Sequence, residues 1–202
     1  MTTFSFAREL WGSDASGLLA LTLWCFSPNI LGYAGLVTPD GAATSFGLLA
    51  TYLFWRWLKK PDWKRATLAG LALGLAEVSK SSWIILFGLW PLLTVFWLLT
   101  DSSLRTSRAT WLRMSGQLTA VLAIGLYMLN AAYLFDGTGT RLGEFEFVSA
   151  TLAGEEFAGE GRNRFHGTPF ADIPMPLPRQ YICGIDVQKR DLESYGQPSY
   201  LC

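Results

Sequence analysis

Five apolar stretches, separated by short polar turns, constrain this chain more than any other feature of its sequence. They cover residues 15–37, 41–58, 66–78, 82–99 and 118–135, and the residues Ser27-Pro28-Asn29 interrupt the first one. A helix needs about 20 mostly apolar residues to cross a hydrocarbon core of ~30 Å. The third stretch is shorter, and we expect it to form a short or tilted span. The pattern predicts an all-α integral membrane protein with about five transmembrane helices.

The charges divide the chain into two regions. Half of the 202 residues are hydrophobic and 16% are charged, with a net charge of zero. Residues 1–135 hold ten basic and six acidic side chains, whereas residues 136–202 hold six basic and ten acidic ones. We therefore expect a multi-span membrane region, 1–135, followed by an irregular, water-exposed loop or tail, 136–202. Nucleic-acid binding is not expected, because no basic face is dense enough to neutralise phosphates.

Basic residues mark two of the turns and predict the orientation in the membrane. One group lies between the second and third stretches, and another between the fourth and fifth: Arg56, Lys59, Lys60, Lys64 and Arg65, then Arg105, Arg108 and Arg113. Both turns should face the cytoplasm by the positive-inside rule. The chain should then lie in the plasma (inner) membrane as a multi-pass protein. Asp40, Lys80 and residues 136–202 would face the extracytoplasmic side together.

The third stretch also carries a pattern that favours close helix packing. Gly70 and Gly74 form a GxxxG motif, which lets a second helix approach closely. Small residues are also common in membrane helices without any such partner, so the motif leaves both interpretations open.

Asp40 is the first polar residue at the membrane boundary that needs an explanation. It directly precedes a long apolar stretch. An acidic residue is stabilised there by the unpaired N–H groups and the dipole of a helix N-terminus. Alternatively, the carboxylate binds a cation or acts on a sugar or hydroxyl acceptor. Both roles are compatible, because a capping position also fixes the geometry of the carboxylate.

Glu77, Lys80 and Ser81 form the second polar group at this boundary. Glu77 and Lys80 are three residues apart, so on a helix they share a face and can pair. One interpretation is an interfacial ion pair in which the Lys80 ammonium reaches water. In the other, Lys80 and the neighbouring Ser81 bind the phosphate of a lipid-linked substrate, and Glu77 holds the ammonium in place.

The cysteines and the single histidine do not predict a metal site. Cys25, Cys183 and Cys202 form no CxxC pair and no metal-ligand spacing with His166. Cys183 and Cys202 could form a disulfide in an oxidising compartment. The sequence leaves that question open.

Several segments, taken in order, resemble one family of membrane enzymes. Residues 27–40 contain SPN and end in VTPD, and residues 46–53 (FGLLATYL) follow before the basic turn. Residues 69–76 (AGLALGLA) then lead to Ser79-Lys80. This order resembles the dolichyl-phosphate-mannose–protein mannosyltransferase and aminoarabinose transferase superfamily, glycosyltransferase family 39 with the GT-C fold. The resemblance covers roughly residues 15–100.

The resemblance implies an inverting glycosyltransferase with a polyprenyl-phosphate sugar donor. The donor would give a hexose or pentose to a protein, lipid or glycan acceptor on the extracytoplasmic side. Asp40 matches the family's second acidic position and is the expected catalytic residue, while Lys80, Glu77 and Ser81 are expected to bind substrate. The resemblance implies no organic cofactor and leaves a divalent metal ion open.

The resemblance also implies that this chain is a fragment. The family's principal acid lies in an outward loop that would precede Met1, and its members have further spans. We therefore expect the chain on its own to lack turnover. The alternative is a non-catalytic multi-span scaffold or a fragment of a transporter, although no inverted repeat of the transporter type is evident.

Overall fold

The computed structural model describes residues 1–34, 39–100, 108–154 and 161–193, and the chain divides into two compact units. Unit 1 is Met1–Met128 and unit 2 is Leu129–Cys202. The described residues contain nine α-helices and two isolated β-bridges but no strand, which confirms the all-α class. The boundary between these compact units lies after Met128. The membrane and extracytoplasmic assignments of the two regions stay predictions.

Unit 1 begins with three helices, α1 (Thr2–Trp11), α2 (Asp14–Cys25) and α3 (Pro28–Ala34). Gly12 ends α1 with a positive φ of 66°, a conformation that glycine adopts without strain. The side chain of Ser13 then accepts a hydrogen bond from the Ala15 N–H and caps α2. The predicted interruption at residues 27–29 is a real helix break, because Pro28 fits the first turn of a new helix but cannot continue the old one.

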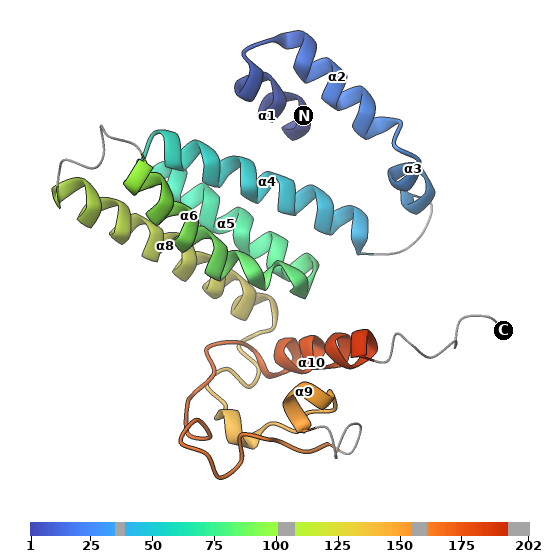
Figure 1. Ribbon diagram of the computed structural model, residues 1–202, viewed down its shortest axis with the longest axis vertical. Coiled ribbons are helices and arrows are strands. Elements are labelled where there is room, and N and C mark those ends of the chain that lie inside the picture. Colours follow the sequence, from blue (N-terminus) through green and yellow to red (C-terminus); the bar gives the residue numbers. More distant parts are fainter. Residues whose placement is uncertain (35–38, 101–107, 155–160, 194–202) are drawn as a thin grey trace. The chain divides into compact units, whose positions relative to one another are not determined.

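The remaining helices of unit 1 are α4 (Asp40–Lys59), α5 (Trp63–Ser79), the short 3₁₀ turn η1 (Ser81–Ile84), α6 (Ile85–Thr100) and α8 (Arg108–Ala132), which continues into unit 2. Figure 1 shows α4, α5, α6 and α8 as a bundle of neighbouring helices. Helix α8 starts ten residues before the apolar stretch that predicted it. The polar residues of its first turns extend the helix beyond the apolar segment.

The bundle is held together by aromatic rings and by a seam of small residues. The rings of Phe54 on α4 and Trp90 on α6 stack with their centroids 4.3 Å apart. At Gly74 on α5, an added Cβ would lie 2.4 Å from the Cβ of Met128 on α8, and at Gly70 it would lie 2.8 Å from the Val121 carbonyl oxygen. Of the two interpretations of GxxxG, the structure therefore favours the close approach of a second helix, with α8 as the partner.

Among the residues that the structure describes, two helical segments are long and apolar enough to cross a membrane, Ser81–Thr100 and Arg108–Ala132. Large apolar side chains of α6, such as Leu92 and Phe96, are about two thirds exposed, as expected for residues that face lipid. The five spans expected from the sequence stay a prediction.

Unit 2 contains more regular structure than the sequence predicted. It holds η2 (Leu142–Glu144), α9 (Ala150–Ala153) and the 15-residue helix α10 (Arg179–Glu193), where an irregular region was expected. Its apolar core is small: Phe145, Phe147, Ala153 and Ile182. The possible Cys183–Cys202 disulfide cannot be assigned, because Cys202 lies outside the described residues.

Candidate functional site

An ion pair joins Asp40 to Lys80 at one end of helices α4 and α5. The ammonium nitrogen of Lys80 donates to Oδ1 of Asp40 at 2.6 Å, across forty residues of sequence. Both side chains are about two fifths exposed. The prediction that these two residues lie at the same end of the helices is confirmed. The sequence indicated that Lys80 can pair with Glu77, and the structure gives Lys80 an ion pair with Asp40.

Local backbone geometry explains how the pair forms. Asp40 is the first residue of α4 and follows Pro39, so its carboxylate lies at the helix N-terminus as predicted. Lys80 directly follows α5 and has extended backbone angles, with φ −160° and ψ 128°. Because Lys80 has left the helix, its side chain no longer follows the α5 face that carries Glu77. It reaches the start of α4 instead.

Trp83 fixes the turn after Lys80 against the first half of α4. Its indole N–H donates to the Ala43 carbonyl oxygen at 3.1 Å. Its ring lies over Gly47, where an added Cβ would come within 1.9 Å of the indole. Asp40, Ala43 and Gly47 occur at i, i+3 and i+7, so they share the face of α4 that meets this turn. Trp83 therefore positions Lys80 next to Asp40.

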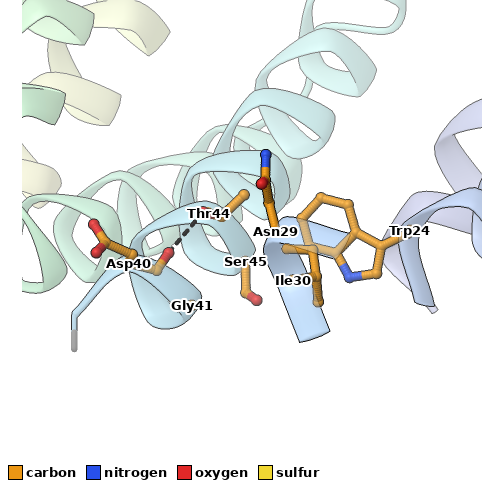
Figure 2. A pocket seen from close by; sticks show the side chains of 7 residues that line it. All are labelled: Trp24, Asn29, Ile30, Asp40, Gly41, Thr44 and Ser45. Atoms are coloured by element: carbon orange, nitrogen blue, oxygen red, sulfur yellow. Dashed lines mark hydrogen bonds between the residues drawn. The ribbon is translucent and has the colours of Figure 1, made fainter. Parts of the chain in front are cut away.

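A pocket of about 310 Å³ opens beside Asp40. Figure 2 shows Thr44, Ser45 and Asn29 between Asp40 and the indole of Trp24. The lining thus combines hydroxyls, an amide and an aromatic ring, contributed by α2, α3 and α4, and the Asp40 carboxylate at its edge points away from Trp24. The Thr44 hydroxyl donates to the Asp40 backbone oxygen at 2.6 Å, a hydrogen bond within α4. This set of groups suits a ligand that carries several hydroxyl groups.

The other two predicted site residues flank Lys80 in sequence. Glu77 is on the last turn of α5 and is only 1% exposed. Ser81 begins η1 and is half-buried. Both therefore belong to the same end of the bundle as the Asp40–Lys80 pair.

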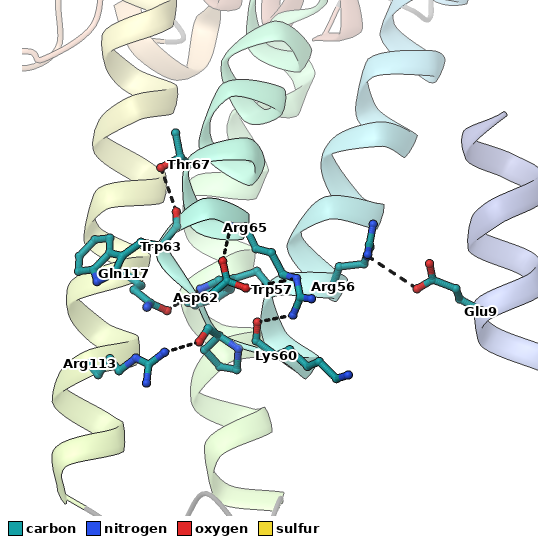
Figure 3. A network of polar contacts seen from close by, with 11 residues as sticks. Glu9, Arg56, Trp57, Lys60, Asp62, Trp63, Arg65, Thr67, Arg113 and Gln117 are labelled. Atoms are coloured by element: carbon teal, nitrogen blue, oxygen red, sulfur yellow. Dashed lines mark hydrogen bonds and ion pairs between the residues drawn. The ribbon is translucent and has the colours of Figure 1, made fainter.

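The opposite end of α4 and α5 carries the basic turn. Figure 3 shows contacts that tie this end together: Arg56 with Glu9, Arg65 with Asp62, and Arg113 with the Pro61 carbonyl oxygen. The Arg113 contact, at 2.6 Å, brings the start of α8 to the turn between α4 and α5. The twenty residues of α4 rise by about 30 Å, close to the thickness of a hydrocarbon core. The basic turn between α4 and α5 and the Asp40–Lys80 ion pair thus lie at opposite ends of α4, a helix as long as the hydrocarbon core is thick.

The described residues do not fit a divalent metal site. Nowhere in the described ranges do three or more His, Cys, Asp or Glu side chains gather in a group that could hold a metal ion. Hard divalent cations require several oxygen ligands. Asp40, the carboxylate of the pocket lining, is instead paired with an ammonium group.

Comparison with known proteins identifies the family. A family model described as dolichyl-phosphate-mannose-protein mannosyltransferase matches residues 2–131. The chain belongs to this family. The match covers the helices from α1 to α6 and nearly all of α8, and so includes Asp40, Glu77, Lys80 and Ser81. No curated protein and no solved structure matches the chain. The resemblance inferred from the sequence is therefore confirmed at the level of the mannosyltransferase family.

Sequence reasoning missed two residues that build the site. Neither Trp83 nor Gly47 was predicted as a site residue, although together they set the approach of η1 to α4. The available signal was the pair of small residues Ala43 and Gly47 on the face of α4 that also carries Asp40. That pattern indicates a large side chain packed on the helix, but it does not tell which one.

Proposed function

We propose that this chain forms part of a membrane glycosyltransferase that moves a sugar from a polyprenyl-phosphate donor to a hydroxyl-bearing acceptor. Family membership over residues 2–131 supports the reaction class. The observation that carries the assignment of residues is the Asp40–Lys80 pair beside a pocket of about 310 Å³. The sugar is a hexose or pentose, and the acceptor is a protein, lipid or glycan.

In this proposal Lys80 binds the donor phosphate. An ammonium group offers three N–H donors and a compact positive charge, which suits a phosphate oxygen. When the bond between the sugar C1 and the phosphate oxygen breaks, the negative charge grows on the departing phosphate. Lys80 stabilises that charge, and a group already held in place does so most effectively.

Asp40 receives the proton of the acceptor. The acceptor oxygen attacks C1 from the face opposite the phosphate, which inverts the configuration, and its proton passes to the Asp40 carboxylate. The ion pair connects the two roles. A donor phosphate competes with Asp40 for the Lys80 ammonium, so donor binding releases the carboxylate for its role as a base.

Glu77 and Ser81 have supporting roles. The buried Glu77 lies one turn before Lys80 in the chain and adds negative charge to the end of the bundle where Lys80 binds the phosphate. The Ser81 hydroxyl, next to Lys80 in the chain, contributes a further hydrogen-bond donor to the phosphate. The lipid bilayer surrounds the helices, and the polyprenyl chain of the donor lies in it beside them. No nucleic-acid partner is proposed.

The proposed topology follows from the two ends of α4. The end with the basic turn faces the cytoplasm, and the Asp40–Lys80 end faces the extracytoplasmic side of the plasma membrane. Residues 136–202 belong on that same side. Cysteine labelling of single-cysteine variants in intact cells checks this arrangement, because a label on residues 136–202 requires outside access.

The decisive experiment measures donor binding to the full chain in detergent micelles. Labelled polyprenyl-phosphate hexose is titrated into the unaltered chain, Lys80→Ala and Asp40→Asn. Losing a charged hydrogen bond to phosphate should weaken donor binding about tenfold or more for Lys80→Ala. Asp40→Asn keeps the size of the side chain and removes the carboxylate that competes for Lys80, so donor binding should be retained or become tighter. In any preparation with transferase activity, it should lower sugar transfer by about a hundredfold or more.

A matched control removes a distant cation. Arg108→Ala deletes an exposed positive charge at the start of α8, five residues before the contact with Pro61. It should leave donor affinity unchanged. Equal donor affinity in Lys80→Ala and the unaltered chain would refute the assignment and support a non-catalytic scaffold instead.

A further inference from the structure

Two adjoining hollows lie at the end of α4 and α5 that carries the basic turn. One has a volume of about 340 Å³ and the other of about 240 Å³, and both are lined by Arg56 and Arg65. The first also contacts Leu53, Asp62, Lys64 and Leu68, and the second contacts Glu9, Lys59 and Lys60. Neither hollow includes a residue of the Asp40–Lys80 site.

The lining carries more positive charge than its own carboxylates can balance. Five cationic residues face two acidic ones, which leaves a net charge of +3 around the hollows. Arg65 lies 3.3 Å from Asp62, and Arg56 lies 3.9 Å from Glu9, a longer and weaker pair. Within the described part of the chain, Lys60 and Lys64 have no carboxylate within ion-pair distance. The cluster therefore offers an anion positive charge and N–H donors that its own carboxylates do not neutralise.

The same hollows have an apolar side. Leu53 lies one turn from Arg56 on α4, and Leu68 lies one turn from Arg65 on α5. Each arginine of the rim is thus followed, toward the middle of its helix, by an aliphatic side chain on the same face. Leu68 is 41% exposed. A free inorganic anion would gain nothing from contact with these aliphatic side chains. A lipid acyl chain would bury apolar surface against them.

Helix α1 adds a second indication that a lipid is the ligand. Glu9 brings the end of α1 to the hollows, where it contacts Arg56 and accepts a hydrogen bond from the Tyr52 hydroxyl at 2.6 Å. The next two residues, Leu10 and Trp11, are 51% and 77% exposed. Exposed tryptophan beside cationic residues is typical of the boundary between membrane and water.

We propose that the corner formed by α1, α4 and α5 binds an anionic phospholipid. The phosphate of the headgroup lies between Arg56 and Arg65, with Lys60 and Lys64 at the rim. The acyl chains extend along Leu53 and Leu68. This lipid site is separate from the proposed donor site and about one membrane thickness away from it along α4.

The test uses native mass spectrometry of the full chain in detergent micelles, titrated with phosphatidylglycerol. We expect phosphatidylglycerol to bind at one saturable site. Phosphatidylcholine should bind more weakly, and its binding should not saturate over the same concentration range. Lys64→Gln should weaken phosphatidylglycerol binding about fivefold, the effect expected of one basic residue near an anionic lipid. Lys60→Gln should act in the same direction. Leu68→Gln should also weaken binding of the lipid, although it changes no charge.

Arg108→Gln is the matched control, because it removes one positive charge at the same end of unit 1 but outside both hollows. It should leave phosphatidylglycerol affinity unchanged. An equal loss in Lys64→Gln and Arg108→Gln would mean diffuse surface attraction and would overturn the proposal. Inorganic phosphate that displaces the lipid at equal concentration would also overturn it, since the site would then be a simple anion site.

Donor binding separates this proposal from the function proposed above. Lys64→Gln should keep full affinity for polyprenyl-phosphate hexose while losing phosphatidylglycerol. A parallel loss of both ligands would show that the corner is not a separate lipid site.

Discussion

The two units of this chain are stabilised in different ways. In unit 1, long helices meet through small residues and aromatic rings, and the ion pairs of α4 and α5 lie at the two ends of these helices. In unit 2, polar side chains bind backbone groups that are far away in sequence. The buried Asp186 of α10 accepts hydrogen bonds from the N–H groups of Val148 and Ser149 at 2.6 and 3.0 Å. Asn163 donates to the Leu142 and Phe145 carbonyl oxygens.

This difference shows how each unit uses its polar residues. Unit 1 keeps most of its charged residues at the helix ends, where they remain available to ligands, and relies mainly on packing for stability. Unit 2 uses them as structural groups, because its apolar core is too small to order the loops alone. Substitutions should therefore act through volume in unit 1 and through hydrogen bonding in unit 2.

The largest effect should come from the helix seam of unit 1. Gly74→Leu places a side chain where an added Cβ would already lie 2.4 Å from Met128 Cβ, so α5 and α8 must separate. We expect a loss of stability of about 3 kcal/mol or more, measured as thermal unfolding in detergent by circular dichroism. Gly116→Leu is the control, because nothing lies within 4 Å of an added Cβ there. Similar unfolding temperatures for both variants would argue against the seam.

The next effect belongs to the buried carboxylate of unit 2. Asp186→Ala leaves two backbone N–H groups without their acceptor and should destabilise unit 2 by about 2 to 3 kcal/mol. Hydrogen exchange at Val148 and Ser149 should become faster, while exchange in α4 and α5 stays unchanged. Asp191→Ala, which removes an exposed carboxylate beside Arg190, should have little effect. An equal loss of stability in Asp186→Ala and Asp191→Ala would contradict the idea that hydrogen bonds of buried polar side chains stabilise unit 2.

A polar contact inside unit 1 should have a smaller effect. The indole N–H of Trp57 donates to Oε1 of the buried Gln117 at 2.9 Å. Gln117→Leu leaves this N–H without an acceptor and should destabilise unit 1 by about 1 to 2 kcal/mol. Adding Trp57→Phe removes the donor as well and should recover part of the loss in the same unfolding assay. If the double variant is less stable than Gln117→Leu alone, packing of the indole and not its hydrogen bond dominates the effect.

The smallest effect is a pH dependence in unit 2. The Thr151 hydroxyl donates to the Glu193 carboxylate and, with the N–H groups of Ala150 and Thr151, lowers the pKa of Glu193 below its ordinary value of 4.5. Since the pKa is lower in the folded state, the contact stabilises unit 2 above pH 4.5 and is lost as the pH falls through the folded pKa. Exchange at Ala150 and Thr151, measured relative to the intrinsic amide exchange rate at each pH, should rise on acidification. Glu193→Gln should remove most of this dependence, and an unchanged profile would contradict it.

Helix periodicity made most of unit 1 predictable. The apolar stretches correspond to α4, α5, α6 and α8, and the residues 27–29 correctly mark the break between α2 and α3. The basic turns also placed Asp40 and Lys80 at one end, because the positive-inside rule puts those turns on the other side of the membrane. The choice of Lys80's partner was not predictable from spacing, since its backbone leaves the helix at that residue.

Unit 2 was much harder to predict from its sequence. Its aromatic anchors were visible, but the caps that Asp186 and Glu193 provide for the segment around α9 join residues about forty positions apart. Helix α10 buries Tyr181, Ile182 and Asp186 along one side, a set that mixes apolar and charged residues. A pattern of that kind does not stand out by hydrophobicity. In the candidate site, the packing of Trp83 on Gly47 was hidden for the same reason, because it joins two distant segments.

The central claim is that Asp40 and Lys80 form a ligand site and not merely a structural ion pair. Exchanging the charges, in the double variant Asp40→Lys with Lys80→Asp, tests it most directly. A half-exposed ion pair contributes at most about 1 kcal/mol, so the exchanged variant should unfold near the temperature of the unaltered chain. We predict that its affinity for polyprenyl-phosphate hexose nevertheless falls about tenfold or more, as in Lys80→Ala. Full donor affinity in the exchanged variant would contradict the claim.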